Sequence, residues 1–583
     1  MILDRINGPK DLKTLSASER KELAQEIRQA MLKRASIHGG HFGPDFGIVE
    51  ATIALHTVFD SPKDKIVWDV SHQVYPHKIL TGRKQAYLEE EHYDDVSGYS
   101  NPAESEHDFF EVGHTSTSIS LASGLAMARD LQGGHENIIA VIGDGSMSGG
   151  EALEGLDTVG EMGTNMIIVL NDNQMSIAEV HGGMYKGFEE LRRTGGKSEH
   201  NLFRAMGLDY RFVADGNDSE ALIKVFREVK DIDHPVVVHI VTQKGKGYKF
   251  AEEDKESWHW HMPFDIETGE VKHPYVDEAA ELTATYLLDR MKTDKKLAVL
   301  TAATPSSFGF ISERRKQAGK QFIDVGIAEE QAVAMASGLA KGGARPVFGD
   351  YATFFQRTYD QISQDVCINN NPAVFLVFGA SMYSMNDVTH LCIFDIPMMA
   401  NIPNLVYLAP VSLAEYKAML AWALDQTDHP VAIRVPVLPV SSEGRVIRTD
   451  YSQLNTYEVT RRGEEVAILG LGNFYGLAEQ TAAELEKKGI HATIINPTYI
   501  TGLDTDLLES LKKDHRLVVT MEDGVLDGGF GEKIARSYGS SDMKTYAFGL
   551  EKKFYDRYDY EKLAEEYNLK PELAAKKILD LIK

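Results

Sequence analysis

The sequence contains few cysteines and no long hydrophobic run. Only two of its 583 residues are cysteine, Cys367 and Cys392, which is too few for a disulfide framework and favours a reducing compartment. No stretch approaches the roughly 18 uninterrupted apolar residues that a transmembrane helix requires. The first residues also lack the apolar core of a signal peptide. We therefore expect a cytoplasmic protein with no membrane span.

The sequence also lacks an excess of positive charge. Lys and Arg number 61 and Asp and Glu number 87, which gives a formal net charge of −26. This balance argues against a broad binding surface for nucleic acid or for an anionic membrane. Any phosphate must then be bound by a few placed cations, by backbone N–H groups or by a metal ion. Hydrophobic residues make up 43% and charged residues 25%, which is typical of a globular protein.

Short apolar runs alternate with amphipathic helical stretches along most of the chain, a pattern typical of parallel β-sheets covered by helices. The expected strands fall in three sets: 137–143, 166–170 and 236–241; then 297–300, 346–348, 374–378 and 405–408; then 466–470, 491–495 and 517–520. Helices are expected over 150–160, 329–341 and 558–583. Polar connectors at 265–277 and 437–455 separate the sets. We therefore predict an α/β protein with three domains, at 1–265, 278–436 and 456–583.

The most informative motif is Gly143-Asp144-Gly145, followed after a helix and a strand by Asn171-Asp172-Asn173. Ligands bind in open α/β sheets at the carboxyl ends of the strands, where both triplets are expected. Asp144, the Asn173 amide oxygen and the Met175 carbonyl offer the oxygen ligands that Mg²⁺ prefers. The glycines allow the backbone to approach a diphosphate closely. A GDG triplet alone is common in turns, but this pair at this spacing indicates thiamine diphosphate with Mg²⁺.

With these motifs, the chain resembles the transketolase-type thiamine-diphosphate enzymes and, within them, the 1-deoxy-D-xylulose-5-phosphate synthases. The resemblance runs nearly end to end. Its specific pieces are residues 40–42, 68–83, 113–120, 324–329 and 351–357, together with the cofactor motif. It implies a homodimer with diphosphate-binding, pyrimidine-binding and C-terminal domains. It also implies that pyruvate loses CO₂ on the cofactor and that the two-carbon unit attacks glyceraldehyde 3-phosphate, in the route to isoprenoid and thiamine precursors.

The resemblance also assigns site residues. Glu329 is implied to contact the cofactor's aminopyrimidine ring and to promote loss of the thiazolium proton. Imidazole transfers protons near neutral pH, and the implied catalytic residues are Glu329, His41, His72 and His390. The implied cofactor ligands are His72, Gly113, His114, Thr115, Ser116, Asp144, Gly145, Ser146, Asn173, Met175, His259 and Glu329. The implied substrate ligands are Tyr351, Arg357, Asn386 and His390. The hydroxyl-rich run 113–120 enters a predicted helix and can present N–H donors to a diphosphate.

The sequence departs from the family in the region assigned to the acceptor aldehyde. An arginine of the family aligns with Gly379, an aspartate aligns with Asn386, and a second arginine aligns with Val437. Arg434 matches a neighbouring family arginine instead of the missing one. Each charge-assisted bond to a phosphate contributes roughly 1.5–3 kcal/mol, so loss of two arginines would weaken a phosphorylated acceptor by about 10²- to 10⁴-fold. The region between residues 175 and 215 is also shorter than in the family.

Four hypotheses remain open at this point. The first is a 1-deoxy-D-xylulose-5-phosphate synthase. The second is a related carboligase or transketolase that uses another aldehyde or ketose. The third is the decarboxylating component of a 2-oxoacid dehydrogenase complex, which the histidine motifs disfavour. The fourth is a non-catalytic homologue, which the retention of Asp144, Asn173 and Glu329 disfavours. A transition-metal site at residues 258–261 is also weak, because it offers two histidines without a carboxylate or a thiolate at zinc spacing.

Overall fold

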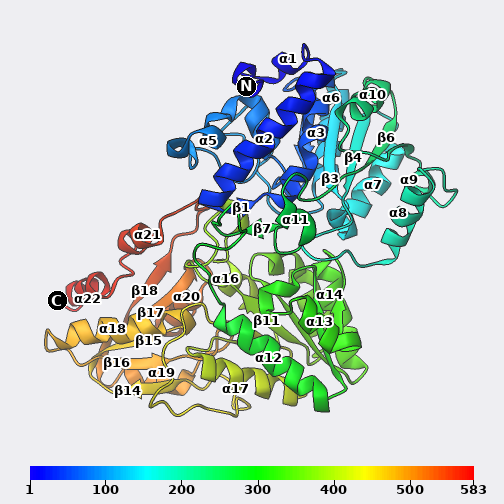
Figure 1. Ribbon diagram of the computed structural model, residues 1–583. Helices are drawn as coiled ribbons and strands as arrows, with labels where there is room; N and C mark the ends of the chain where they lie inside the picture. The colour runs from blue at the N-terminus through cyan, green and yellow to red at the C-terminus, as the bar shows by residue number, and fades with distance from the viewer. The chain divides into compact units, whose positions relative to one another are not determined.

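The computed structural model describes residues 1–583, which form two compact units (Figure 1). Unit 1 comprises Met1–Tyr275 and Gly326–Ala328, and unit 2 comprises Val276–Val325 and Glu329–Lys583. Both units contain mostly parallel sheets with helices packed against them, so the predicted α/β class is confirmed. None of the helices combines the length and the hydropathy of a membrane span.

Unit 1 is built on one five-stranded parallel sheet in the order β2-β3-β4-β6-β5. Its strands are β2 (Lys65–Trp68), β3 (Ile138–Gly143), β4 (Met166–Asp172), β5 (Asp209–Val213) and β6 (Pro235–Val241). The three strands expected from the sequence here are therefore present. A separate antiparallel pair joins β1 (Gly40–His41) to β7 (Trp260–His261).

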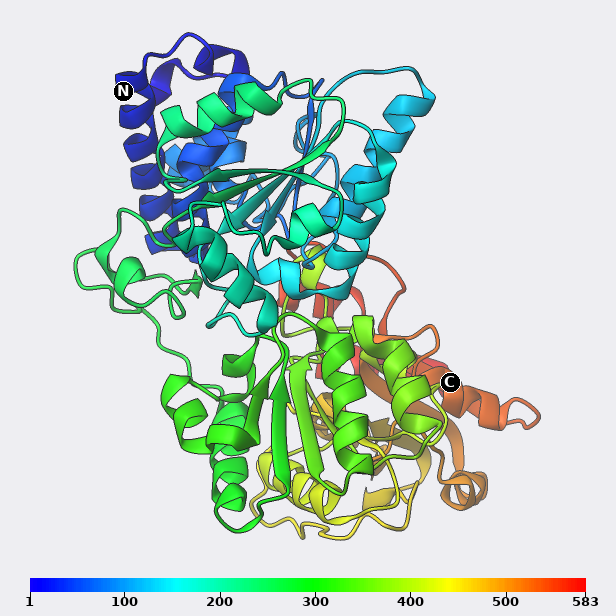
Figure 2. The ribbon, with the colours of Figure 1, turned by 90° about the vertical axis from the view of Figure 1, so that its right-hand side faces the viewer.

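Alternation of side chains along these strands creates two cores, one on each face of the sheet. Along β3, Ile139 and Val141 join a cluster with residues of α3 (Gly43–Val58) and α10 (Ser219–Val229). Ile138, Ala140 and Ile142 join a second cluster with α6 (Ser118–Leu131) and α7 (Gly150–Met162). Because both faces are covered, as Figure 2 shows, the central strands β3 and β4 are apolar over most of their length. Unit 1 also contains α2 (Ala17–His38), α8 (Gly183–Arg193), α9 (Leu202–Ala205) and α11 (Lys249–Glu253).

The first sheet of unit 2 has six parallel strands in the order β12-β13-β11-β10-β8-β9. The strands are β8 (Leu297–Thr301), β9 (Phe322–Asp324), β10 (Arg345–Tyr351), β11 (Val374–Phe378), β12 (Val406–Leu408) and β13 (Val431–Arg434). The helices are α12 (Glu278–Thr293), α13 (Ser312–Ala318), α14 (Glu329–Lys341), α16 (Asp395–Met399) and α17 (Leu413–Asp425). The bounds of α14 coincide with the predicted helix.

The second sheet of unit 2 has the order β14-β16-β15-β17-β18, and only the β14–β16 pair is antiparallel. The strands are β14 (Glu458–Arg461), β15 (Glu465–Gly470), β16 (Thr493–Asn496), β17 (His515–Val525) and β18 (Lys544–Leu550). The helices are α18 (Tyr475–Glu486), α19 (Thr505–Leu511), α20 (Phe530–Tyr538), α21 (Tyr560–Glu566) and α22 (Pro571–Leu581). One buried cluster contains residues of both sheets, including Phe348 and Leu469. The predicted division into three domains stays a prediction.

The expectation of one helix over 558–583 is wrong, because two helices occupy this segment. Asn568, after the end of α21, has φ +57°, and the Leu569 N–H donates to the carbonyl of Ala564. This left-handed residue ends the first helix. Lys570 is then extended, and Pro571 begins α22, because proline disfavours a helical residue before it and suits the first helical position.

Candidate active site

The register of unit 1 brings the two halves of the cofactor motif together at one edge of the sheet. Gly143 at the end of β3 lies opposite Asn171 of β4. The backbone N–H of Asp144 donates to the carbonyl of Asn171 at 3.0 Å. A Cβ atom on Gly145 would lie 2.9 Å from the Cβ of Ser176. Because real Cβ atoms do not approach so closely, glycine is required where this loop passes the segment after β4.

Asp144 is the most unusual carboxyl group of this edge. It is 1% exposed, and its Oδ2 has no hydrogen-bond partner within the chain. Burial and the nearby Asp172 raise its pKa well above the ordinary value, while backbone N–H groups, first that of Asn173, act in the opposite direction. A buried carboxylate with an unsatisfied oxygen is costly unless something compensates it. Asp144 therefore fits a residue that binds a hard cation.

Of the other two predicted metal ligands, Asn173 lies beside Asp144, and Met175 bonds Asn173. The Asn173 amide oxygen accepts the Met175 N–H at 3.1 Å, and Gln174 between them has φ +65°. The buried carboxylate of Asp172, unlike that of Asp144, has charged or polar side-chain partners. Its Oδ2 contacts Arg192 and lies 2.8 Å from His239 Nε2. Oxygen donors of the Asp144 and Asn173 kind are those that Mg²⁺ prefers, so these residues fit the predicted ion.

The predicted diphosphate run 113–116 is shaped by a carboxylate that the sequence analysis missed. Asp69 accepts the N–H of Ser116 at 2.9 Å and the N–H of Ser118 at 3.0 Å. The Ser116 hydroxyl donates to the carbonyl of Ser146 at 2.7 Å. The Ser116 N–H thus binds the loop to Asp69, and its hydroxyl binds the loop to Ser146, next to the GDG triplet. Gly113, His114 and Thr115 precede this point, outside α6.

Lys244 is a second residue that the sequence analysis missed. It is 1% exposed, and its Nζ donates to the carbonyl of Ser176 at 2.7 Å. Burial lowers its pKa to about 7, and Asp144 acts in the opposite direction. The sequence signal for Lys244 was slight, because a lysine after the strand 236–241 is indistinguishable from a surface residue.

Three predicted histidines form one cluster. The ring centroids of His41, His72 and His259 are 5.1 Å (His41–His72), 5.4 Å (His41–His259) and 5.3 Å (His72–His259) apart. Pairing of β1 with β7 brings His41 close to His259. His72 follows Val70 and Ser71, whose φ values of +57° and +62° are strained for such residues. Burial, followed by Lys244 and the neighbouring histidines, lowers the pKa of His259 well below its usual range.

In unit 2, Glu329 is the first residue of α14 and is 3% exposed. Its Oε2 accepts no hydrogen bond and lies 3.8 Å from the guanidinium of Arg357. Burial raises the pKa of Glu329 to about 7, and Arg357 acts in the opposite direction. The preceding residues Gly326–Ala328 belong to unit 1, where the Ile327 N–H donates to the Ser148 hydroxyl at 2.8 Å.

Asp350, at the end of β10, is a third buried carboxyl group and was not predicted. It is 0% exposed, and its Oδ1 accepts from the Thr304 hydroxyl at 2.9 Å. Burial and then Glu329 raise its pKa well above the ordinary value. The negative charge of Glu329 therefore helps to keep Asp350 protonated.

The predicted substrate residues lie on elements next to Glu329. The rings of Tyr351 and Phe354 are 6.2 Å apart, and those of Phe354 and His390 are 5.8 Å apart. The His390 Nδ1 lies 2.8 Å from the Thr389 hydroxyl, which donates to Asp387 at 2.6 Å. Burial lowers the pKa of His390 to about 4, so its imidazole is neutral at pH 7.

Asn473 bonds Val437 and Ala380, the residue after Gly379. The Asn473 side-chain amide donates to the carbonyl of Ala380 at 3.1 Å, and its oxygen accepts the N–H of Val437 at 2.8 Å. Gly379 has φ +66°, and a Cβ there would lie 2.9 Å from the Ser384 hydroxyl. A neutral amide therefore connects Val437 to the residue that follows Gly379; Val437 and Gly379 are the two positions expected from the sequence to lack arginine.

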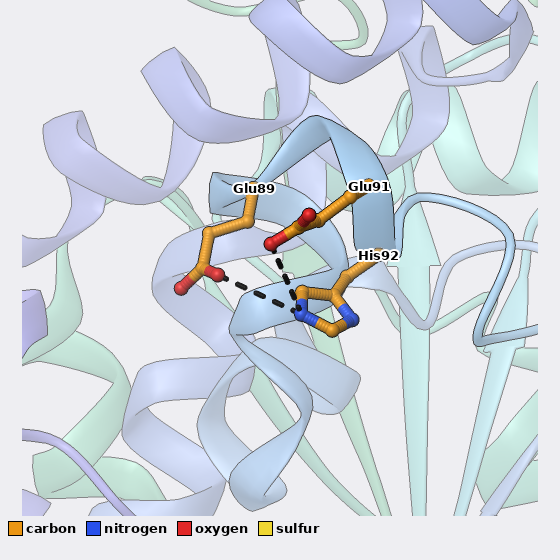
Figure 3. A group of neighbouring side chains, drawn as sticks. All are labelled: Glu89, Glu91 and His92. Atoms are coloured by element: carbon orange, nitrogen blue, oxygen red, sulfur yellow. Dashed lines mark ion pairs between the residues drawn. The ribbon is translucent and has the colours of Figure 1, made fainter.

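A separate group of possible metal ligands lies on the surface of unit 1. Glu89, Glu91 and His92 offer atoms within 4.8 Å of one another, and the His92 Nε2 lies 3.7 and 3.9 Å from the two glutamates (Figure 3). The three residues are neighbours in sequence, and both glutamates are exposed. Proximity here follows from local sequence, and exposed acidic groups of this kind do not by themselves indicate a metal site.

Comparisons with known proteins agree with this arrangement. The family model described as 1-deoxy-D-xylulose-5-phosphate synthase matches residues 3–198 and 194–242. The transketolase pyrimidine-binding and C-terminal domain models match 279–440 and 455–572. The two segments of the first match meet inside the region that the sequence analysis expects to be shortened.

Curated relatives are similar over the whole chain. The 1-deoxy-D-xylulose-5-phosphate synthase of Clostridium beijerinckii is 36% identical over 622 aligned positions, which cover 100% of this chain and 99% of the relative. That of Carboxydothermus hydrogenoformans is 38% identical and covers 98% of this chain and 97% of the relative. Among solved structures, transketolase from Leishmania mexicana covers 97% of both chains at 15% identity with a TM-score of 0.43. On the sequence relatives, the chain belongs to the 1-deoxy-D-xylulose-5-phosphate synthase family.

Proposed function

We propose that this chain catalyses the condensation of pyruvate with glyceraldehyde 3-phosphate, with loss of CO₂, to give 1-deoxy-D-xylulose 5-phosphate. Full-length membership in the family supports the reaction. The structural observation that supports this reaction most directly is the predicted cofactor site at the carboxyl ends of β3 and β4 in unit 1. There Asp144, with an unsatisfied buried oxygen, lies beside Asn173 at the ends of two adjacent parallel strands.

In this proposal Asp144, Asn173 and the Met175 carbonyl would hold Mg²⁺, which would supply positive charge to the diphosphate of thiamine diphosphate. Gly113, His114, Thr115, Gly145 and Ser146 would line the diphosphate, and Lys244, whose Nζ donates to the carbonyl of Ser176, would add a positive charge when protonated. Ser116 contributes by holding the loop, since its N–H and hydroxyl are engaged with Asp69 and Ser146. Mg²⁺ and Lys244 would thus offset the negative charge of the diphosphate on a chain whose own net charge is −26.

Thiamine diphosphate, when bound, supplies a nucleophilic carbon and an electron sink. Glu329 exchanges a proton with the pyrimidine ring through its carboxyl oxygens, and a pKa of about 7 suits this exchange near neutral pH. Burial lowers the pKa of His259, so its imidazole is neutral, and His41, His72 and His259 would donate to or accept from substrate oxygens. Tyr351, Asn386 and His390 border the acceptor, with Arg357 oriented by Glu329.

A second candidate is a carboligase that prefers another acceptor, in particular one without a phosphate. It is favoured by the neutral Asn473 between Gly379 and Val437. The two candidates separate in one assay. Purified protein with thiamine diphosphate, Mg²⁺ and pyruvate is given glyceraldehyde 3-phosphate or D-glyceraldehyde, and CO₂ and ketose are measured. Ketose from glyceraldehyde 3-phosphate supports the first, and ketose from D-glyceraldehyde alone supports the second.

We also propose that the protein acts as a cytoplasmic homodimer, as the family resemblance implies. Both cysteines are free and buried, which is compatible with a reducing compartment. Sedimentation equilibrium tests the assembly, because a dimer has twice the chain mass of 64.8 kDa. A single species at the chain mass would contradict the dimer without affecting the proposed chemistry.

A further inference from the structure

The segment 379–390, here called the acceptor loop, ends in a short turn that is built around one aspartate. Val388–His390 forms a single 3₁₀ turn, and Asp387 precedes it as the N-cap residue. The Asp387 carbonyl accepts the backbone N–H of His390 at 3.0 Å. Its side-chain Oδ1 accepts the backbone N–H of Thr389 at 2.9 Å. Asp387 therefore fixes the backbone of the two residues that end the turn.

The same oxygen of Asp387 also takes the one proton of the Thr389 hydroxyl. The hydroxyl donates to Oδ1 at 2.6 Å. Burial raises the pKa of Asp387, and the bonds from Thr389 act in the opposite direction. Because Oδ1 already accepts an N–H, it is an acceptor in both bonds, and a proton on this carboxyl group belongs on Oδ2. The Thr389 hydroxyl is thus a donor to Asp387 in either state of the acid.

His390 must then be the donor in its contact with Thr389. The His390 Nδ1 lies 2.8 Å from the Thr389 hydroxyl oxygen. Since the hydroxyl proton is directed to Asp387, this oxygen can only accept from the imidazole, and the ring proton is on Nδ1. A neutral imidazole has a single N–H. Nε2 of neutral His390 therefore has the lone pair and meets its own partners as an acceptor.

The rest of the turn is attached to the segment 556–558 within unit 2. The Asn386 side-chain amide donates to the carbonyl of Tyr558 at 2.9 Å, and the Asn386 carbonyl accepts the N–H of Arg557 at 2.7 Å. The Val388 N–H donates to Asp556 Oδ1 at 3.3 Å. These bonds lie on both sides of Asp387 in the chain, so they hold its side chain beside Thr389.

We propose that Asp387 and Thr389 are positioning residues that fix His390 in the Nδ1–H tautomer, so that its Nε2 serves the reaction as a hydrogen-bond acceptor and a base. The inference rests on the proposed carboligation for the substrate that His390 meets. A proton that moves from a substrate hydroxyl to Nε2 gives an imidazolium that keeps its Nδ1–H bond to Thr389. The same proton returns from Nε2 to a substrate oxygen, so the bonds between Thr389 and Asp387 stay unchanged.

The ¹⁵N chemical shifts of the ring nitrogens in histidine-labelled protein test the tautomer directly, and His390→Gln identifies the His390 signals. At pH 8 the proton of wild-type His390 should be on Nδ1. Asp387→Ala releases the Thr389 hydroxyl to donate to Nδ1, so the Nε2–H tautomer should appear. Asp387→Asn should keep the Nδ1–H tautomer, because its amide oxygen still accepts. A wild-type proton on Nε2, or an unchanged tautomer in Asp387→Ala, would overturn the inference.

Kinetics separate this positioning role from a packing role of Thr389. Thr389→Val keeps the shape and removes the hydroxyl. It should lower kcat by about 10- to 100-fold, a part of the roughly 10²- to 10⁴-fold that a proton-transfer group contributes. KM for glyceraldehyde 3-phosphate should stay within about threefold of wild type. Thr389→Ser keeps the hydroxyl, so its kcat should also stay within about threefold.

The matched control is Asp504→Ala. Asp504 is likewise an N-cap aspartate of unit 2 that accepts two hydrogen bonds, from the N–H groups of Leu507 at 2.9 Å and Tyr457 at 3.0 Å. Its loss should lower Tm and leave kcat and the His390 tautomer unchanged. Equal losses of kcat in Thr389→Val and Thr389→Ser, or none in Thr389→Val, would contradict the positioning role. If wild type forms no ketose with any aldehyde, the proposed function fails, and the ¹⁵N comparison still decides the tautomer.

Discussion

At the scale of single residues, the candidate site contains several carboxyl groups that are buried with incomplete hydrogen bonding. Glu329 Oε2, Asp350 Oδ2 and Asp144 Oδ2 have no hydrogen-bond partner within the chain. Burial raises the pKa of all three. Such groups lower the stability of a fold, and groups with shifted pKa values gather where acids, bases and metal ligands are required. These acids lower the stability of the fold, so their burial is better explained by a role in catalysis or metal binding.

Glu329→Gln is expected to abolish turnover while increasing the stability of the cofactor-free protein above neutral pH. Loss of a general acid–base group lowers kcat by about 10²- to 10⁴-fold, measured as CO₂ release from pyruvate. The folded carboxyl has a pKa of about 7 against an ordinary 4.5. The Glu329 carboxyl group binds its proton more tightly in the folded state than in the unfolded state. Its contribution to folding stability is therefore present below pH 4.5 and is lost as the pH rises to 7.

Unfolding by denaturant at several pH values measures the second effect. The stability of wild type relative to Glu329→Gln should fall by roughly 3 kcal/mol between pH 4.5 and pH 8, as 1.36 kcal/mol per pKa unit implies. A difference that does not change with pH would contradict the raised pKa of Glu329. Normal CO₂ release by the variant would remove Glu329 from the proposed mechanism.

The sequence did not reveal the site residues whose role depends on contacts with distant parts of the chain. Asp69 lies within a matched motif, yet its two bonds to Ser116 and Ser118 depend on a loop nearly fifty positions away. Lys244 is an ordinary charged residue in the sequence, and only the fold brings it to the carbonyl of Ser176. By contrast, Asp144 and Asn173 were predictable because the spacing of the motif fixes the strand ends.

At the scale of elements, strands that are buried on both faces were the most predictable. The expected strand 374–378 has the bounds of β11, and the helix 329–341 has those of α14. Short or half-buried strands such as β9 and β14 were missed, because their residues are only partly buried and their apolar pattern is weak. The break between α21 and α22 was missed because Asn568 in a polar helix gives a weak stop signal.

The pairing of β1 with β7 is the element that brings His41 to His259, and Gly43 keeps the two segments close. A Cβ on Gly43 would overlap the carbonyl of Trp258. Gly43→Ala is therefore expected to separate the segments, to lower carboligase kcat/KM by more than about 10-fold and to lower Tm, since overpacking costs typically 1–3 kcal/mol. Steady-state kinetics and thermal unfolding measure the two effects.

Gly187→Ala is the matched control for this variant. Gly187 lies inside α8 of the same unit, and an added Cβ meets nothing within 4 Å. Alanine stabilises a helix interior by about 0.8–1 kcal/mol relative to glycine, so Tm should be unchanged or slightly raised and activity retained. Wild-type kinetics and Tm in Gly43→Ala would show that the approach of residue 43 to Trp258 is not required.

At the scale of the whole molecule, the chain is strongly acidic and yet is proposed to bind an anionic cofactor. A net charge of −26 opposes anions at long range, although salt screens this field beyond about 8–10 Å. Binding then depends on local groups in a buried site, where charges interact more strongly. Asp144 supplies no positive charge there, and its buried Oδ2 has no hydrogen-bond partner within the chain. Thiamine diphosphate should consequently bind with Mg²⁺ and bind poorly without it.

This dependence predicts a stability change in the whole protein. Thiamine diphosphate and Mg²⁺ together, at 100 times the dissociation constant, should stabilise the fold by about 2.7 kcal/mol, seen as a rise in Tm. Either component alone, or both with a chelator, should produce little rise. Asp144→Asn should remove the joint effect, and Glu91→Gln in the exposed group of Glu89, Glu91 and His92 should keep it. If thiamine diphosphate alone raised Tm as much as the pair does, or if Asp144→Asn retained the rise, the acidic edge of unit 1 would not be the site at which Mg²⁺ offsets the negative charge of the chain.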